Sequence, residues 1–115
     1  MGVTVAEMRA LALGLPEATE VEAWGHPTFR VRNKMFATCA SDDTPDPTAS
    51  FKATLEEQAE LIASEPDAYS VPAYVGKHGW VQVRLGAVGA DVLREHLVDA
   101  WRRIAPKRLV ASSGL

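Results

Sequence analysis

Several features of secreted and membrane proteins are missing from this chain of 115 residues. Its single cysteine, Cys39, cannot form an internal disulfide, which excludes a disulfide-stabilised scaffold. The apolar runs are only a few residues long, far below the roughly 20 residues that a transmembrane helix needs. No basic stretch leads into a long apolar run near the N-terminus, so the sequence predicts a cytoplasmic protein that does not associate with membranes.

The sequence also has little that indicates catalysis. No nucleophile constellation, metal-ligand spacing or phosphate-binding loop stands out, so we predict no catalytic residues, no metal site and no cofactor. Asp42, Asp43 and Asp46 lack the glycine and terminal glutamate of a calcium loop, and they fit a solvated turn. Cys39 alternates with Met35 and Ala37, as expected for a small apolar side chain in a strand. The sequence therefore favours a binding protein over an enzyme.

Acidic residues are absent from three stretches that have the pattern of strands, residues 28–40, 51–53 and 71–88. The basic residues in these stretches are Arg30, Arg32, Lys34, Lys52, Lys77 and Arg84. Because the whole chain has a net charge of −3, this segregation predicts a positive surface on a negative molecule. Such a surface is typical of a binding face.

The order of the expected elements predicts the fold class. Helices are expected over residues 4–15, 54–65 and 89–105, and strands over 21–24, 28–32, 34–40, 49–53, 71–75 and 80–85, the last two as a hairpin. This order, α-β(3-4)-α-β2-α, predicts an α+β two-layer sandwich with a largely antiparallel sheet and helices on one face. We expect one domain over residues 1–108 and a frayed tail over 109–115.

Three segments carry a family resemblance. The segments at residues 24–31 (WGHPTFRV), 34–37 (KMFA) and 74–81 (YVGKHGWV) resemble the MmcQ/YjbR family of small bacterial proteins, and the likeness extends over nearly the whole chain. The resemblance implies a two-layer domain similar to frataxin and to type III secretion chaperones. Members of the family are often labelled DNA-binding, so it also implies a nucleic-acid ligand, but it brings no catalytic residues.

Alternation along two strands suggests where a ligand binds. Thr28, Arg30 and Arg32 are expected on one side of their strand, and Trp80 and Arg84 on one side of another. If these sides coincide, they form a basic and aromatic platform for bases and phosphates. The candidate nucleic-acid contacts are Arg30, Arg32, Lys34, Lys52, Lys77, His78, Trp80 and Arg84, and Trp24 and His26 are further possible ligand contacts. The alternative is a solvated face on which long basic side chains cover apolar neighbours.

These observations leave two kinds of partner open. The first is nucleic acid, bound weakly and in a salt-sensitive way because the chain is acidic overall. The second is a protein segment bound as by a secretion chaperone, with little dependence on salt. In either case we expect a monomer or a weak dimer. A small-molecule enzyme ranks last and would require a deep pocket between the sheet and the helices that contains His26 or Trp24.

Overall fold

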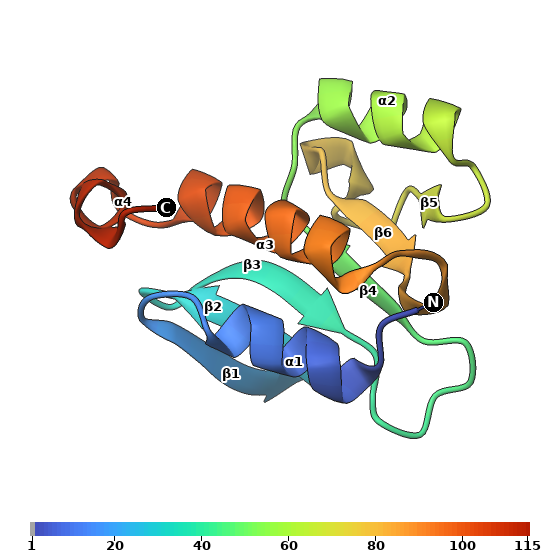
Figure 1. The fold of residues 1–115 in the computed structure, drawn as a ribbon, viewed down its shortest axis with the longest axis horizontal. Helices are drawn as coiled ribbons and strands as arrows, with labels where there is room; N and C mark the ends of the chain where they lie inside the picture. The colour runs from blue at the N-terminus through green and yellow to red at the C-terminus, as the bar shows by residue number, and fades with distance from the viewer. Residues whose placement is uncertain (1) are drawn as a thin grey trace.

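An antiparallel sheet forms the frame of the molecule (Figure 1). The structure is a computed structural model that describes residues 2–115. The elements are α1 (Val5–Leu13), β1 (Ala18–Ala23), β2 (His26–Val31), β3 (Lys34–Cys39), β4 (Thr48–Phe51), α2 (Leu55–Ser64), β5 (Tyr69–Ser70), the 3₁₀ turn η1 (Gly76–His78), β6 (Val81–Arg84), the 3₁₀ turn η2 (Leu85–Ala87), α3 (Ala90–Ile104) and α4 (Lys107–Ser113). The strand order is β1-β2-β3-β4-β6-β5. The predicted α+β fold with an antiparallel sheet is confirmed.

Side-chain caps fix the starts of α1 and α2. The Thr4 hydroxyl accepts a hydrogen bond from the Glu7 N–H at 3.1 Å, while the Glu7 carboxylate accepts one from the Thr4 N–H at 2.9 Å. The Thr54 hydroxyl accepts a hydrogen bond from the Glu57 N–H at 3.0 Å. These bonds satisfy backbone donors that a helix start leaves without a partner. The Thr/Glu spacing in the sequence therefore located both helix starts correctly.

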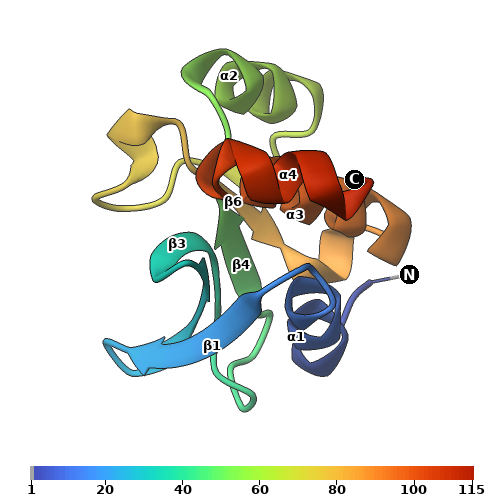
Figure 2. The same ribbon diagram turned by 90° about the vertical axis from the view of Figure 1, so that its left-hand side faces the viewer.

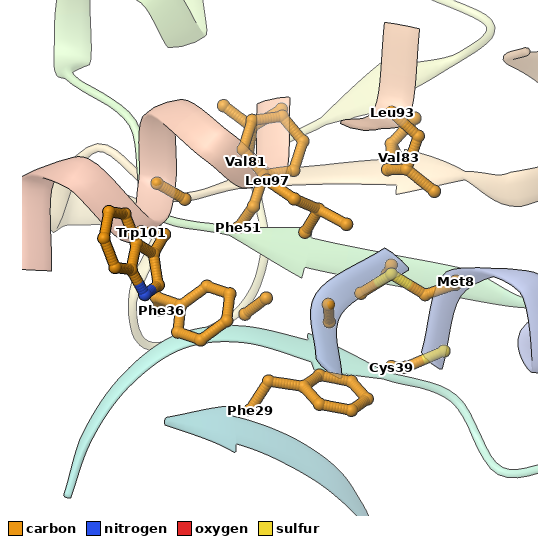
Figure 3. Close-up of a cluster of buried hydrophobic side chains, with 14 of the residues drawn as sticks. Met8, Phe29, Phe36, Cys39, Phe51, Val81, Val83, Leu93, Leu97 and Trp101 are labelled. Carbon is orange, nitrogen blue, oxygen red and sulfur yellow. The ribbon is translucent and has the colours of Figure 1, made fainter. Parts of the chain in front are cut away.

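The hydrophobic core lies between the sheet and the helices α1 and α3 (Figures 1 and 3). The strands contribute Phe29, Val31, Phe36, Ala37, Cys39, Ala49, Phe51, Val81 and Val83. Trp101 of α3 is fully buried, and its indole Nε1 donates a hydrogen bond to the Pro16 carbonyl at 2.9 Å. Burial of this apolar area supplies most of the driving force for folding.

The opposite face of the sheet is polar. The strand register places Thr28 opposite Thr38, Thr38 opposite Ser50, and Ser50 opposite Gln82. Directly opposed residues point to the same side of a sheet, so these side chains form a row across four neighbouring strands. Figure 2 shows α1, α3 and α4 on one side of the sheet and the segment between β5 and β6 on the other. We call this second side the open face.

Two-residue turns connect the first three strands. Trp24 (φ 54°) and Gly25 (φ 82°) join β1 to β2, and Arg32 (φ 51°) and Asn33 (φ 65°) join β2 to β3. Positive φ at both central residues is the signature of a type I′ hairpin turn. The prediction that Arg32 shares a strand side with Arg30 is therefore wrong, because the strand ends one residue earlier and Arg32 lies in the turn.

The predicted strand over residues 71–75 is also wrong. The strand β5 covers only Tyr69–Ser70, and it pairs with β6 in the antiparallel direction expected of the hairpin. The chain then leaves the sheet and reaches η1 through a tight turn at Tyr74, where φ is 65° and the Val75 N–H donates to the Ala73 carbonyl at 2.7 Å. This bond between residues i and i+2 closes a γ-turn with a positive central φ, a rare and strained conformation.

The C-terminal residues form a helix where we expected a frayed tail. Leu109 and Val110 of α4 are half-buried and pack against the core, which explains why this short segment is ordered. Gly114, with φ 77°, follows the end of the helix. Among residues 2–115, no helix is long and apolar enough to cross a lipid bilayer.

Candidate functional site

A pocket of about 720 Å³ lies on the open face of the sheet. Its size is within the range of roughly 300–1,000 Å³ that is typical of small-ligand sites. The lining residues are Trp24, His26, Met35, Thr38, Ser50, Pro72, Ala73, Tyr74, Val75 and Trp80. The pocket therefore lies between the β1–β2 hairpin and the segment that connects β5 to β6. We call it the aromatic pocket.

The central strands supply the floor of the aromatic pocket. Thr38 of β3 and Ser50 of β4 are directly paired, so their hydroxyl groups lie side by side. Met35 adds a flexible apolar side chain from the start of β3. The floor thus combines apolar surface with two groups that can each donate and accept hydrogen bonds.

The tip of the β1–β2 hairpin forms one wall. Trp24 is 78% exposed, and its ring centroid lies 6.3 Å from that of His26, with the two planes tilted by 38°. His26 is half-buried, and its Nδ1 lies 3.3 Å from the Pro27 carbonyl oxygen. The resemblance between this segment and a known family drew attention to both residues, and the structure places both in the pocket.

The segment from β5 to β6 forms the other wall, and side chains from outside the segment hold it in place. The amide Nε2 of Gln58 on α2 donates hydrogen bonds to the Gly76 carbonyl at 2.8 Å and to the Trp80 carbonyl at 2.7 Å. The ammonium Nζ of Lys52 donates to the His78 carbonyl at 2.6 Å. Gln58 is buried, so its two bonds are shielded from water and strengthened.

Close packing against α2 explains the glycine that precedes Trp80. Gly79 has φ 88°, and a Cβ atom there would lie 2.8 Å from the carbonyl carbon of Thr54. Only glycine fits this position. The close approach of Gly79 to the start of α2 places the next residue, Trp80, in the pocket wall, where 6% of its surface is exposed.

Two of the candidate nucleic-acid contacts are engaged in ion pairs. The guanidinium of Arg84 lies 3.2 Å from the Asp46 carboxylate, and it also donates to the Asp67 carbonyl at 3.2 Å. Arg32 pairs with Glu17, and hydrogen bonding to this carboxylate raises the pKa of the guanidinium. These pairs are exposed and so contribute little stability, but they reduce the net charge that either arginine presents to a ligand.

Two of the remaining basic candidates, Arg30 and Lys52, adjoin the aromatic pocket. Arg30 lies opposite Met35 in the β2–β3 pair. Phe51 lies opposite Val81 in the antiparallel β4–β6 pair, so the next residue, Lys52, lies beside Trp80. Lys77 and His78 are exposed and lie in η1. The exposed Lys34 is the first residue of β3 and lies opposite the buried Val31, so it points to the helix side of the sheet and not to the open face predicted for it. Within residues 2–115, none of these five side chains is within 4.0 Å of a carboxylate oxygen as an ion pair.

Two groups with shifted pKa values lie away from the aromatic pocket. Burial raises the pKa of the Cys39 thiol to about 11, as expected for an unreactive core cysteine. His96 of α3 stacks on Phe51 with ring centroids 4.6 Å apart, and its Nε2 lies 2.8 Å from the Tyr69 hydroxyl. Burial lowers the pKa of His96. In the described part of the chain, no group of three or more His, Cys, Asp or Glu side chains is arranged to hold a metal ion.

Sequence reasoning missed seven of the residues that line the aromatic pocket, namely Met35, Thr38, Ser50, Pro72, Ala73, Tyr74 and Val75. Thr38 and Ser50 are ordinary strand residues in sequence, and only the register across β3 and β4 brings them together. Tyr74 carried a usable signal, because it lies two residues after Pro72 and two before Gly76, and a proline within such a run is unfavourable in a central strand.

Comparison with known proteins matches the chain to a family model and to solved structures. A family model described as YjbR matches residues 13–103. The chain is also similar to a solved structure, the Deinococcus radiodurans protein DR2400, described with a family-model domain DUF419. The two share 28% sequence identity with a TM-score of 0.75, and the match covers 98% of this chain and 82% of that one. No curated protein matches this chain.

Proposed function

This chain belongs to the YjbR family, and we propose that it is a non-enzymatic binding domain whose open face binds single-stranded nucleic acid. One observation carries the proposal: Arg30 and Lys52 flank the aromatic pocket on a sheet face to which the strands contribute no carboxylate in residues 2–115. Aromatic groups for bases and cations for phosphates are the two elements that such proteins combine. The cytoplasmic location stays a prediction.

The acidic residues of β1 lie on the other face. Glu20 is opposite the buried Phe29, and its carboxylate accepts a hydrogen bond from Arg9 of α1 at 2.9 Å. Glu22 is two residues further along the strand and therefore points to the same side as Glu20. The carboxylates of β1 thus lie on the face opposite to Arg30 and Lys52.

The chemistry of the pocket lining supports binding more than catalysis. His26 and Tyr74 are its titratable side chains among the described residues, and neither forms a hydrogen bond with a second titratable group. Acid–base catalysis usually requires such convergent pairs. The lining is instead mostly apolar and aromatic, with hydroxyl groups that can orient a bound group.

Fluorescence anisotropy of a labelled single-stranded oligonucleotide, titrated with the protein at two salt concentrations, tests the proposal. We expect saturable binding that weakens as salt increases, because protein cations that neutralise phosphates release counterions. The variant Arg30→Ala should bind more weakly and reduce the magnitude of the salt slope by about 0.7 for each phosphate that is no longer neutralised. Arg108→Ala is the matched control, because it removes the same charge from α4 on the helix side of the sheet.

Two outcomes would contradict the proposal. One is no binding at low salt. The other is equal loss of affinity in Arg30→Ala and Arg108→Ala, which would indicate an effect of net charge alone. Salt-independent capture of a protein segment by the same face would favour the protein-interaction module instead.

A further inference from the structure

Two strained turns place aromatic side chains at the mouth of the aromatic pocket. Trp24 occupies a type I′ turn position that favours Asn, Asp or Gly, and Tyr74 is the central residue of a γ-turn with positive φ. The two residues are 50 positions apart in sequence and belong to different walls. Two independent turns thus accept an unfavourable residue at the same site.

Folding stability does not explain these two aromatic residues. Tyr74 is 94% exposed and Trp24 is 78% exposed, whereas Trp80 and Trp101 are buried. An exposed ring gains little from burial and still bears the backbone strain of its turn. Strained backbone conformations of this kind cluster at binding sites.

The lining determines what kind of group fits inside. Among the described residues, the lining has no Asp, Glu, Lys or Arg, so the enclosed part of a ligand should be uncharged. The rings of Trp24 and Tyr74 offer exposed flat faces, and the mostly buried Trp80 adds apolar surface to the wall. The Thr38 and Ser50 hydroxyls offer donors and acceptors at the floor. This chemistry suits a planar heteroaromatic group that has hydrogen-bonding edges.

The surroundings of the pocket determine what is attached to that group. Arg30 lies beside Met35 and Lys52 beside Trp80, so cations adjoin the lining on both sides. A neutral planar group inside and negative charge outside are the arrangement of a nucleobase with its flanking phosphates. The geometry therefore points to one occupant, an unstacked base of a single nucleic-acid strand.

We propose that the aromatic pocket receives one unstacked base, with Trp24 and Tyr74 as the stacking surfaces at its mouth. This inference rests on the proposed function and specifies it. Duplex bases are paired and stacked, so a duplex offers its phosphates but no base to the pocket. The domain should therefore prefer single strands to duplexes, and a strand with bases to a bare sugar–phosphate chain.

Three labelled ligands of equal length test the inference: a single-stranded oligonucleotide, a duplex, and a single strand in which tetrahydrofuran abasic sites replace the bases. We expect the first to bind at least about 10-fold more tightly than the other two at the same salt concentration. Tyr74→Ala and Trp24→Ala should each lower affinity for the single strand by about 5- to 100-fold with an unchanged salt slope. Tyr74→Phe keeps the ring and should bind as the unaltered protein does.

Val71→Ala is the matched control, because Val71 is an exposed apolar residue of the same segment that does not line the pocket. Equal affinity for the three ligands, or unchanged affinity in both alanine variants, would overturn the base pocket while salt-dependent binding through Arg30 stands. If no ligand binds at low salt, the proposed function fails as well. Both ring residues are exposed, so the variants should fold, and a thermal melt of each verifies this.

Discussion

Replacing Trp24 should separate two effects that the same residue combines, backbone strain and ring surface. In the Trp24→Asn variant, the turn becomes Asn-Gly, which is the preferred sequence for a two-residue turn with positive φ at both positions. In Trp24→Ala, the ring is also removed, but alanine retains most of the strain. The difference in stability between these two variants therefore measures the cost of the backbone strain at position 24.

The expected magnitudes follow from exposure and conformation. Trp24 is 78% exposed, so only about a fifth of its surface is buried, and removing the ring forfeits about 1 kcal/mol at 25 cal/mol per Å². A left-handed conformation costs an ordinary residue about 1–2 kcal/mol. We expect Trp24→Ala to lower the free energy of unfolding by about 1 kcal/mol. The free energy of unfolding of Trp24→Asn should be about 1 kcal/mol higher than that of Trp24→Ala.

Urea denaturation and thermal melts of the two variants provide the measurement. A difference of 1 kcal/mol corresponds to a shift of about 4 °C in Tm for a domain of this size. Both variants should lose the same affinity for a single-stranded oligonucleotide, because both lack the ring. If the two variants are equally stable, Trp24 is not strained, and the argument that its turn tolerates an unfavourable residue for the sake of a ligand is refuted.

Three further predictions concern groups around the core. Gln58→Leu should lower the free energy of unfolding by about 2 kcal/mol and speed hydrogen exchange in residues 76–80, because two carbonyls lose a buried partner; unchanged exchange would show that this amide does not hold the segment. Burial lowers the pKa of His96 below its usual 6.5, so the unfolded chain binds more protons, and stability should fall as pH decreases below about 6.5. His96→Gln should flatten this part of a pH series of denaturation curves, and an equally steep decline in the variant would assign it to other groups. Because burial raises the pKa of Cys39 to about 11, a thiol reagent at pH 8 should label it only upon unfolding, and rapid labelling of the folded protein would contradict that burial.

Local signals in the sequence were sufficient for most of the fold. Helix caps such as Thr4 with Glu7, and the alternation of residues 81–85, depend on neighbours in the chain, so the sequence reports them directly. The segment at residues 71–75 was misleading because its valines and tyrosine have high strand propensity. Gln58 on α2 forms hydrogen bonds with the Gly76 and Trp80 carbonyls, which hold the residues after this segment away from the sheet. The sequence of the segment itself contains no sign of these bonds.

The candidate site was predictable only in part. The sequence showed that basic residues are separated from acidic ones, and it predicted Trp24, His26 and Trp80 as ligand contacts. It could not show that Arg84 meets Asp46 across 38 residues, or that Thr38 and Ser50 share a floor. Charge partners and pocket floors are tertiary properties, since they arise from strand register and loop path.

The two walls of the aromatic pocket are held with different firmness. The β5–β6 segment is anchored to α2 and to the end of β4 by buried or short hydrogen bonds, whereas the opposing hairpin tip extends from β1, an edge strand with β2 as its sheet neighbour. We therefore expect the first wall to be more rigid than the hairpin tip, where residues 26 and 27 of β2 pair with β1 alone. Small movements of the tip would change the width of the pocket without a change in the core, so planar groups of different thickness should be able to bind between the same residues.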